Sequence, residues 1–322
     1  MLLRLLPRFG TVFAGLLLLL FFAAFAENFA SLGNLAVILK ETSFLAIIAI
    51  GFALALTTAE LDLSVADVAS LAAVTTGALI QGGSAPAVAV LAGLGVGLGA
   101  GLLNGFAVTV LKVPSLIATL GTAAIAKGLG FMLTQGVAFV GRWPRDFTGL
   151  ARGSLLGVSN LIWWMAGIAF LAWLLLKWTR TGLHMVATGE ADEAARLAGI
   201  RTGRMKRLGL ALAGLMAGIL AVLMAASLSS AAPGMAGDHF LYAIAAVLLG
   251  MTMIEPGRPN IPGTLVAAFM LKTLGNGLVL LGAPYYAQDI ALGVIIIGSV
   301  ALSSTVMRRA AFTKKLNFRM GG

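Results

Sequence analysis

The chain has 322 residues, of which 60% are hydrophobic and only 11% are charged. Soluble globular proteins carry about 25% charged residues, so this composition excludes a soluble enzyme, a disordered chain and a nucleic-acid-binding domain. A polytopic membrane protein remains, because lipid can solvate so much apolar surface. We therefore expect the net charge of +10 in cytosolic loops rather than on a nucleic-acid-binding face.

Ten apolar runs are candidates for membrane-spanning helices, each of which needs about 20 residues. The second, third and eighth runs are short or interrupted, so the sequence predicts an all-α fold with about ten spans and a lower bound of eight. The first run also has the basic start of a signal sequence, but a first membrane helix accounts for the same residues. The runs are 9–26, 43–57, 65–81, 87–111, 115–135, 159–176, 208–230, 240–254, 262–282 and 290–307.

The distribution of basic residues predicts the orientation. With ten spans and a cytosolic N-terminus, 16 of the 22 Lys and Arg residues lie in cytosolic segments and only 4 in outer segments. Lys and Arg favour the cytosolic side of a membrane protein, so both termini are predicted to be cytosolic. The whole chain, 1–322, then forms one transmembrane domain with a charged cytosolic loop at 177–207.

Glycine recurs every four residues in the fourth run, at Gly93, Gly97, Gly101 and Gly105. Small residues at this spacing allow another helix backbone to approach closely. We expect this stripe to pack against a helix of the same chain, with a subunit interface as the alternative.

Lys127 and Lys272 lie near the centres of the fifth and ninth runs. A charge at the bilayer centre costs about 2.5–3.5 kcal/mol, so both side chains are expected to face the bundle interior or a wet cavity. Each is either paired for structural reasons or placed along the path of a solute. Asn104 and Asn276 are lesser candidates for this path, since each could instead bond a neighbouring helix.

Three carboxylates and three hydroxyls interrupt the apolar pattern between residues 57 and 67. Glu60, Asp62 and Ser64 are the path candidates in this stretch. A plain cytosolic turn fits the pattern, and so does an unwound segment that lines a cavity, because irregular backbone at membrane depth survives only there.

Residues 189–200 read GEADEAARLAGI and predict a short cytosolic helix that ends at Gly199. Its acidic residues suit the positive N-terminal end of a helix, and its arginine suits the other end. The helix docks either on the protein's own loops or in a groove on a cytosolic partner.

This segment, with the basic cluster after it, resembles the glutamate-alanine coupling motif of bacterial ABC-importer permeases. From about residue 43 to 303 the chain resembles the ribose/monosaccharide permease family. Nine short segments, in this order and spacing, carry the resemblance: 61–65 (LDLSV), 104–105 (NG), 113–114 (VP), 117–122 (IATLGT), 127–129 (KGL), 243–250 (AIAAVLLG), 257–258 (GR), 263–264 (GT) and 276–278 (NGL). The chain departs from the family pattern at Ala59, Glu60, Ala66, Asp67 and Lys272, which leaves open a solute more polar or charged than a pentose.

The resemblance implies a permease in the bacterial inner membrane that imports a monosaccharide or related small polar solute. It also implies a separate cytosolic ABC ATPase, a periplasmic solute-binding protein and a second permease subunit, identical or not. This chain would be no enzyme and would hold neither cofactor nor metal, because ATP and magnesium would bind to the ATPase. The residues that would couple it to the ATPase are Glu190, Glu193, Ala194, Ala195, Arg196 and Gly199.

Two alternatives stay open. A branched-chain amino-acid permease of the same broad superfamily would need the same kinds of partner. An ion- or proton-coupled secondary transporter belongs to a different class; it would leave the 189–200 segment without a role, and the sequence shows no clear repeat of two halves.

Overall fold

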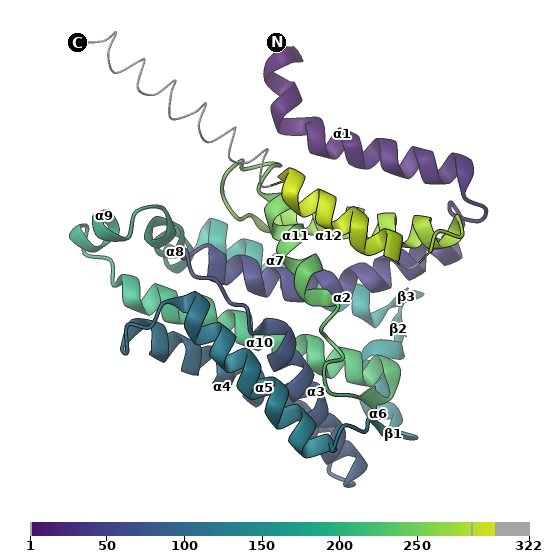
Figure 1. Ribbon diagram of the computed structural model, residues 1–322, viewed down its shortest axis with the longest axis horizontal. Coiled ribbons are helices and arrows are strands. Elements are labelled where there is room, and N and C mark those ends of the chain that lie inside the picture. Colours follow the sequence, from purple (N-terminus) through teal and green to yellow (C-terminus); the bar gives the residue numbers. More distant parts are fainter. Residues whose placement is uncertain (1, 285, 300–322) are drawn as a thin grey trace. The chain divides into compact units, whose positions relative to one another are not determined.

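The computed structural model describes residues 2–284 and 286–299, and this part of the chain is mostly helical (Figure 1). The helices are α1 (Leu2–Phe25), α2 (Leu32–Leu56), α3 (Val65–Gln81), α4 (Pro86–Thr109), α5 (Ser115–Thr134), α6 (Arg145–Arg152), α7 (Asn160–Trp178), α8 (Arg180–Glu190), α9 (Asp192–Leu197), α10 (Thr202–Leu228), α11 (His239–Gly250) and α12 (Ile261–Leu280). The strands are β1 (Phe139–Val140), β2 (Ser154–Leu155), β3 (Val158–Ser159) and β4 (Ser230–Ala231), paired as β1–β4 and β2–β3.

Every predicted apolar run overlaps a helix. Among residues 2–284 and 286–299, six helices are long and apolar enough to cross a membrane: α2, α4, α5, α7, α10 and α12. Four shorter apolar helices, Phe13–Phe25, Val65–Gln81, His239–Gly250 and Tyr286–Ser299, match the remaining runs. The end of the tenth run, 300–307, lies outside the described residues. The prediction of a polytopic membrane protein is thus confirmed.

The second helix is longer than predicted, since α2 begins at Leu32 instead of residue 43. Lys40 and Glu41 precede the predicted run, and both are exposed on a helix that continues through them. A charged pair interrupts the apolar pattern of a sequence without breaking any backbone hydrogen bond. The second predicted run therefore belongs to a helix that is long enough to cross a membrane.

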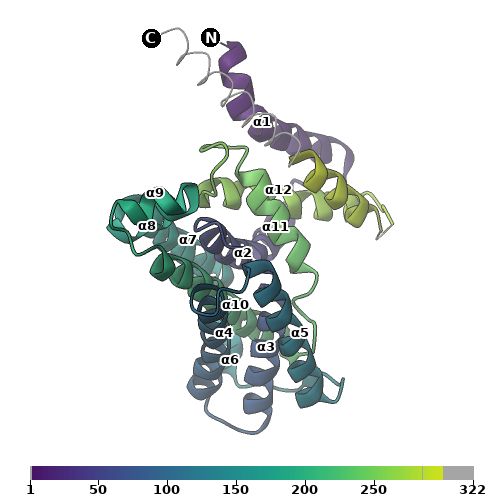
Figure 2. The same cartoon turned by 60° about the vertical axis from the view of Figure 1, so that its left-hand side comes forward.

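The chain divides into two compact units, one formed by residues 39–243 and the other by the two terminal regions, 1–38 and 244–322. In the 39–243 unit, α10 is the central helix and packs along α3 and α4 (Figure 2). It is apolar and buried over most of its length, from Gly209 to Ala226. A helix that is apolar on all sides is expected to be enclosed by other helices in this way.

The glycine stripe of α4 lies against α10, as expected for packing within one chain. A Cβ atom added to Gly97 would collide with the carbonyl oxygen of Gly214, and one added to Gly214 would collide with that of Gly97. Gly93, Gly97, Gly101 and Gly105 are all buried. The two backbones are therefore in direct contact, with no side chain between them.

Helix ends in the 39–243 unit gather at two opposite ends, named here by the helices α9 and α6 that lie at them (Figure 1). At the α9 end, the loop after α2 contacts the start of α5, and a Cβ on Gly189 of α8 would collide with the carbonyl oxygen of Thr57. At the α6 end, β1 pairs with β4 through Phe139 and Ala231. Helix α6 and its short strands were not predicted, because apolar periodicity says little about a segment of 23 loop residues.

In the terminal unit, α1 packs on α12. Phe22 lies in its apolar core, and a Cβ on Gly277 of α12 would collide with that ring. Asn260 begins α12 as an N-cap, because its side chain accepts a hydrogen bond of 2.8 Å from the backbone N–H of Gly263.

Candidate functional site

The loop between α2 and α3 holds the polar residues that the sequence analysis selected. Thr57 and Thr58 end α2 by donating their hydroxyls to the carbonyls of Ala53 and Ala55, at 2.7 and 2.8 Å. Such bonds let hydroxyl side chains sit at a helix end without water. The loop, residues 57–64, is a compact turn whose polar side chains are almost all buried.

Asp62 begins a continuous chain of hydrogen bonds through three helices. Its carboxylate Oδ1 accepts from the backbone N–H and the hydroxyl of Ser64, at 2.9 and 2.5 Å. Asn104 of α4 donates to the Ser64 hydroxyl at 2.9 Å, and Thr122 of α5 donates to Asn104 Oδ1 at 2.5 Å. This polar chain ties the ends of α3, α4 and α5 together.

The same loop is held from α5 through its backbone. Ser115 accepts a hydrogen bond from the N–H of Leu61 at 3.3 Å. Thr119 accepts from the N–H of Leu63 at 3.1 Å. Backbone groups that leave the helical pattern need partners when they are buried, and α5 supplies them.

Burial raises the pKa of the Asp62 carboxyl above its ordinary value, and the hydrogen bonds from Ser64 act in the opposite direction. Asp62, Ser64 and Asn104 are each 1% exposed. In this conformation they bond one another and have no surface left for a solute. The structure thus unites three predicted path residues in a contact between helices.

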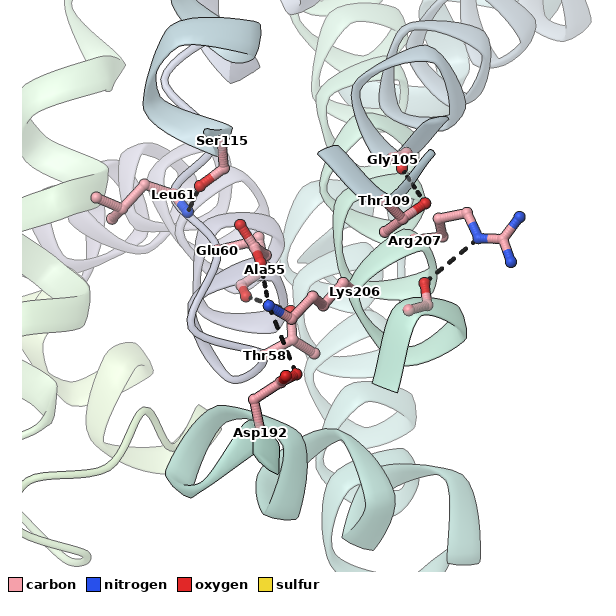
Figure 3. A network of polar contacts seen from close by, with 11 residues as sticks. Ala55, Thr58, Glu60, Leu61, Gly105, Thr109, Ser115, Asp192, Lys206 and Arg207 are labelled. Atoms are coloured by element: carbon pink, nitrogen blue, oxygen red, sulfur yellow. Dashed lines mark hydrogen bonds and ion pairs between the residues drawn. The ribbon is translucent and has the colours of Figure 1, made fainter. Parts of the chain in front are cut away.

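Glu60, the fourth path candidate of this region, makes a different contact (Figure 3). Lys206 of α10 places its Nζ 2.9 Å from Glu60 Oε1 and 3.6 Å from Asp192 Oδ1 at the start of α9. The Glu60 side chain is 7% exposed, whereas that of Asp192 is 45% exposed. We call Glu60, Lys206 and Asp192 the ion triad.

Two members of the ion triad were not predicted from the sequence. Lys206 counted only as one of several cytosolic cations, and Asp192 only as a favourable charge at a helix start. Neither position carries a spacing signal that would select it, because the three residues are 60, 192 and 206 along the chain. Only the packing of α8 and α10 against the end of α2 brings them together.

The predicted coupling segment consists of two helices rather than one. Helix α8 ends at Glu190, and Ala191 has φ −156° and ψ 83° before α9 begins. Glu193, Ala194 and Arg196 are exposed on α9, whereas Ala195 is buried. Gly199 follows α9 with φ +85°, a value that glycine adopts readily and other residues rarely do.

The remaining candidates lie elsewhere. Lys127 is exposed on α5, within electrostatic range of Asp67 on α3. In the terminal unit, Lys272 is half-buried on α12. Asn276 exchanges two hydrogen bonds of 2.9 Å with Asn34, so it bonds a neighbouring helix. Within residues 2–284 and 286–299, no three His, Asp or Glu side chains gather closely enough to hold a metal ion.

Comparison with known proteins identifies the family. Residues 34–300 match the family model described as "Branched-chain amino acid transport system / permease component". The chain is 35% identical to the ribose import permease protein of Escherichia coli (strain K12), over 91% of this chain and 92% of that protein. It is 34% identical to the autoinducer 2 import system permease protein of Yersinia pestis (strain Pestoides F), over 84% of this chain and 77% of that protein.

No solved structure matches the chain significantly. Importers of this kind depend on ATPase and binding-protein partners, and the family assignment decides against an ion-coupled secondary transporter. A permease of this class transports and does not catalyse, as predicted from the resemblance. The similarity extends along nearly the whole sequence, and the apolar helices around the buried polar loop agree with it. The chain therefore belongs to this permease family and is the multi-pass membrane component of a bacterial ABC importer.

Proposed function

We propose that this permease imports a monosaccharide or a closely related small polar solute, with ten membrane spans and both termini in the cytosol. The similarity to the ribose import permease along 91% of the chain is the observation that carries this proposal. A branched-chain amino acid is the second candidate, favoured by the description of the family model. A monosaccharide carries no charged group whereas an amino acid is a zwitterion, so the two solutes compete differently for uptake and can be separated by transport measurements.

The partners would be a cytosolic ATPase, a periplasmic solute-binding protein and a second permease subunit. Helix α9 supports the contact with the ATPase, because Leu197 at its end is 85% exposed beside the exposed Glu193 and Arg196. An apolar side chain ringed by charges is typical of a protein contact. The predicted docking residues Glu190, Glu193, Ala194, Ala195, Arg196 and Gly199 lie on or beside this helix.

Lys127 supports a solute path along α5. Its ammonium group is exposed on a helix that is long and apolar enough to span the membrane. Hydrocarbon would solvate this charge poorly, so the exposed face of α5 near Lys127 would border water or a second subunit. Lys272 on α12 is the other candidate for contact with solute.

Transport by reconstituted vesicles tests the function. The permease would be purified with its cognate ATPase and binding protein, and uptake of radiolabelled ribose measured with ATP inside the vesicles. We expect uphill uptake that stops when ATP is replaced by a non-hydrolysable analogue. Competition by unlabelled ribose, autoinducer 2 or leucine would identify the solute class, and inhibition by leucine alone would refute the sugar assignment.

Docking of the ATPase on α9 can be tested separately. Glu193→Lys reverses an exposed charge on α9, and we expect it to abolish co-purification of the ATPase while the permease stays in the membrane. Asp146→Lys makes the same charge change at the exposed start of α6 and is expected to leave co-purification intact. Gly199→Pro, which cannot adopt φ +85°, should also uncouple uptake from ATP hydrolysis. Normal co-purification and uptake in both variants would refute the docking role.

A further inference from the structure

Resting on the proposed function, we propose that the ion triad of Glu60, Lys206 and Asp192 transmits movement of α9 to the buried loop 57–64 and so couples the ATPase to the helix ends around the solute path. Lys206 is a positioning residue in this mechanism: it contacts neither ATP nor solute. Three features of the structure support the assignment, and each concerns a different part of the relay.

The first feature is the asymmetry of the triad. Lys206 Nζ is at hydrogen-bond distance from Glu60 Oε1, 2.9 Å, but 3.6 Å from Asp192 Oδ1. Within the described part of the chain, Asp192 Oδ1 is buried and accepts no hydrogen bond. Since charged N–H···O bonds are about 2.7–2.9 Å long, a shift of roughly 0.7 Å by α9 would complete the contact. Lys206 is therefore tightly bound to the loop and loosely bound to α9.

The second feature is the backbone on either side of α9. Ala191 has a non-helical backbone and Gly199 has φ +85°, so neither continues the helix. Helix α8, by contrast, is fixed, because Gly189 lies directly against Thr57 of the loop. Helix α9 is thus a short rigid element between two non-helical residues, next to a fixed helix. A partner bound to its exposed face could rotate it without moving α8.

The third feature is the connection of Glu60 to the rest of the loop. Asp62 lies two residues later and is bonded to Ser64, which in turn is bonded to Asn104 of α4. Leu61 lies between Glu60 and Asp62, and its backbone N–H donates a hydrogen bond to Ser115 of α5. A change in the position of Glu60 therefore acts on the ends of α3, α4 and α5. The triad and the polar chain form one contiguous network from α9 to α5.

These contacts also assign Glu60 a role other than a direct solute contact. Its carboxylate is buried and bonded to Lys206, so it has no free surface for a solute in this conformation. Figure 3 shows Lys206 between the loop and α9, with Arg207 directed away from both. Arg207 donates from Nε to the carbonyl of Gly203 at 3.3 Å and is exposed. This neighbour provides a matched control.

The test compares Asp192→Asn and Lys206→Gln with Arg207→Gln in the reconstituted three-component system. The readout is radiolabelled ribose taken up per ATP hydrolysed, together with stimulation of hydrolysis by the loaded binding protein. We expect both triad variants to lower uptake per ATP roughly fivefold or more, which is the lower end of ordinary coupling between sites. Arg207→Gln, which removes the same charge one residue away, should leave the ratio unchanged.

Asp192→Asn protects the test from misfolding, because it leaves the pair of Lys206 and the buried Glu60 intact and changes a side chain that is 45% exposed. Combining it with Lys206→Gln should add little to either single effect, as expected for residues in one relay. An unchanged ratio in Asp192→Asn, an equal fall in Arg207→Gln, or loss of folded Asp192→Asn protein would each overturn the proposal. Wild-type vesicles that take up no ribose would instead count against the proposed function.

Discussion

Helices of the 39–243 unit meet in two different ways, and the difference separates the parts that hold the fold from the parts suited to movement. Along the middle of α4 and α10, glycines bring the two backbones into direct contact. At the α9 end, close glycine contacts such as Gly189 against Thr57 persist, but polar side chains also join the same helices to their neighbours, including Asn104 on α4 and Lys206 on α10.

Backbone contact leaves no side chain that could change rotamer, and close-packed interiors deform little. A hydrogen bond, by contrast, contributes only about 1 kcal/mol net to stability and can be replaced by another when a side chain changes rotamer. We infer that α4 and α10 move as one body in the middle, while contacts at the α9 end can rearrange.

The largest effect is expected where the backbones touch. Gly97→Leu would force a side chain into the carbonyl of Gly214 and separate α4 from α10. We expect a loss of about 3 kcal/mol or more in the free energy of unfolding, because overpacking at a rigid contact cannot be relieved by rotamer changes. The measurement is thermal unfolding and aggregation of the detergent-purified protein.

Gly99→Leu is the matched control, since a Cβ at Gly99 meets nothing within 4 Å on the same helix. We expect this variant to be as stable as the wild type or slightly more stable, because leucine favours helix over glycine. Equal behaviour of the two variants would show that the glycine stripe does not fix the helix pair.

This comparison also shows what the sequence could predict. The apolar runs located the helices, and the four-residue glycine spacing predicted the close approach of α4 to a helix of its own chain. Both signals are local, because helix formation and helix faces follow from residues within a few turns. Short elements such as α6 and the break at Ala191 were not predicted, since a single turn carries too little pattern.

The candidate site was less predictable. Asp62, Ser64 and Asn104 were selected because polar groups among apolar runs need partners, but their bonds to one another depend on how α3, α4 and α5 cross. Thr122 and Lys206 looked ordinary in the sequence, although they complete the polar chain and the ion triad. Residues far apart along the chain meet through tertiary packing, which no local spacing encodes.

An intermediate effect is expected from Asn104→Leu, which removes the link between Ser64 and Thr122. A buried polar group that loses its hydrogen-bond partner costs about 1–3 kcal/mol, so we expect the free energy of unfolding to fall by that amount. Thr122→Val removes only one hydroxyl and should cost less. A variant Asn104→Leu with wild-type stability would mean that the polar chain does not hold the helix ends together.

The smallest effect is a dependence on pH. Burial raises the pKa of Asp62 in the folded protein above its value in the unfolded chain, so the folded state keeps the proton to higher pH. The stability that this carboxyl contributes is complete below the unfolded pKa, near 3.9, and is lost as the pH rises through the folded pKa.

Asp62→Asn stays neutral at every pH, and its Oδ1 can still accept the bonds from Ser64. We therefore expect the unfolding temperature of the variant, relative to wild type, to increase from pH 4 towards pH 8. If the difference in unfolding temperature stayed constant over this range, the hydrogen bonds from Ser64 would outweigh burial in setting the pKa of Asp62. The loop would then hold an ionised carboxylate that is stabilised by these hydrogen bonds.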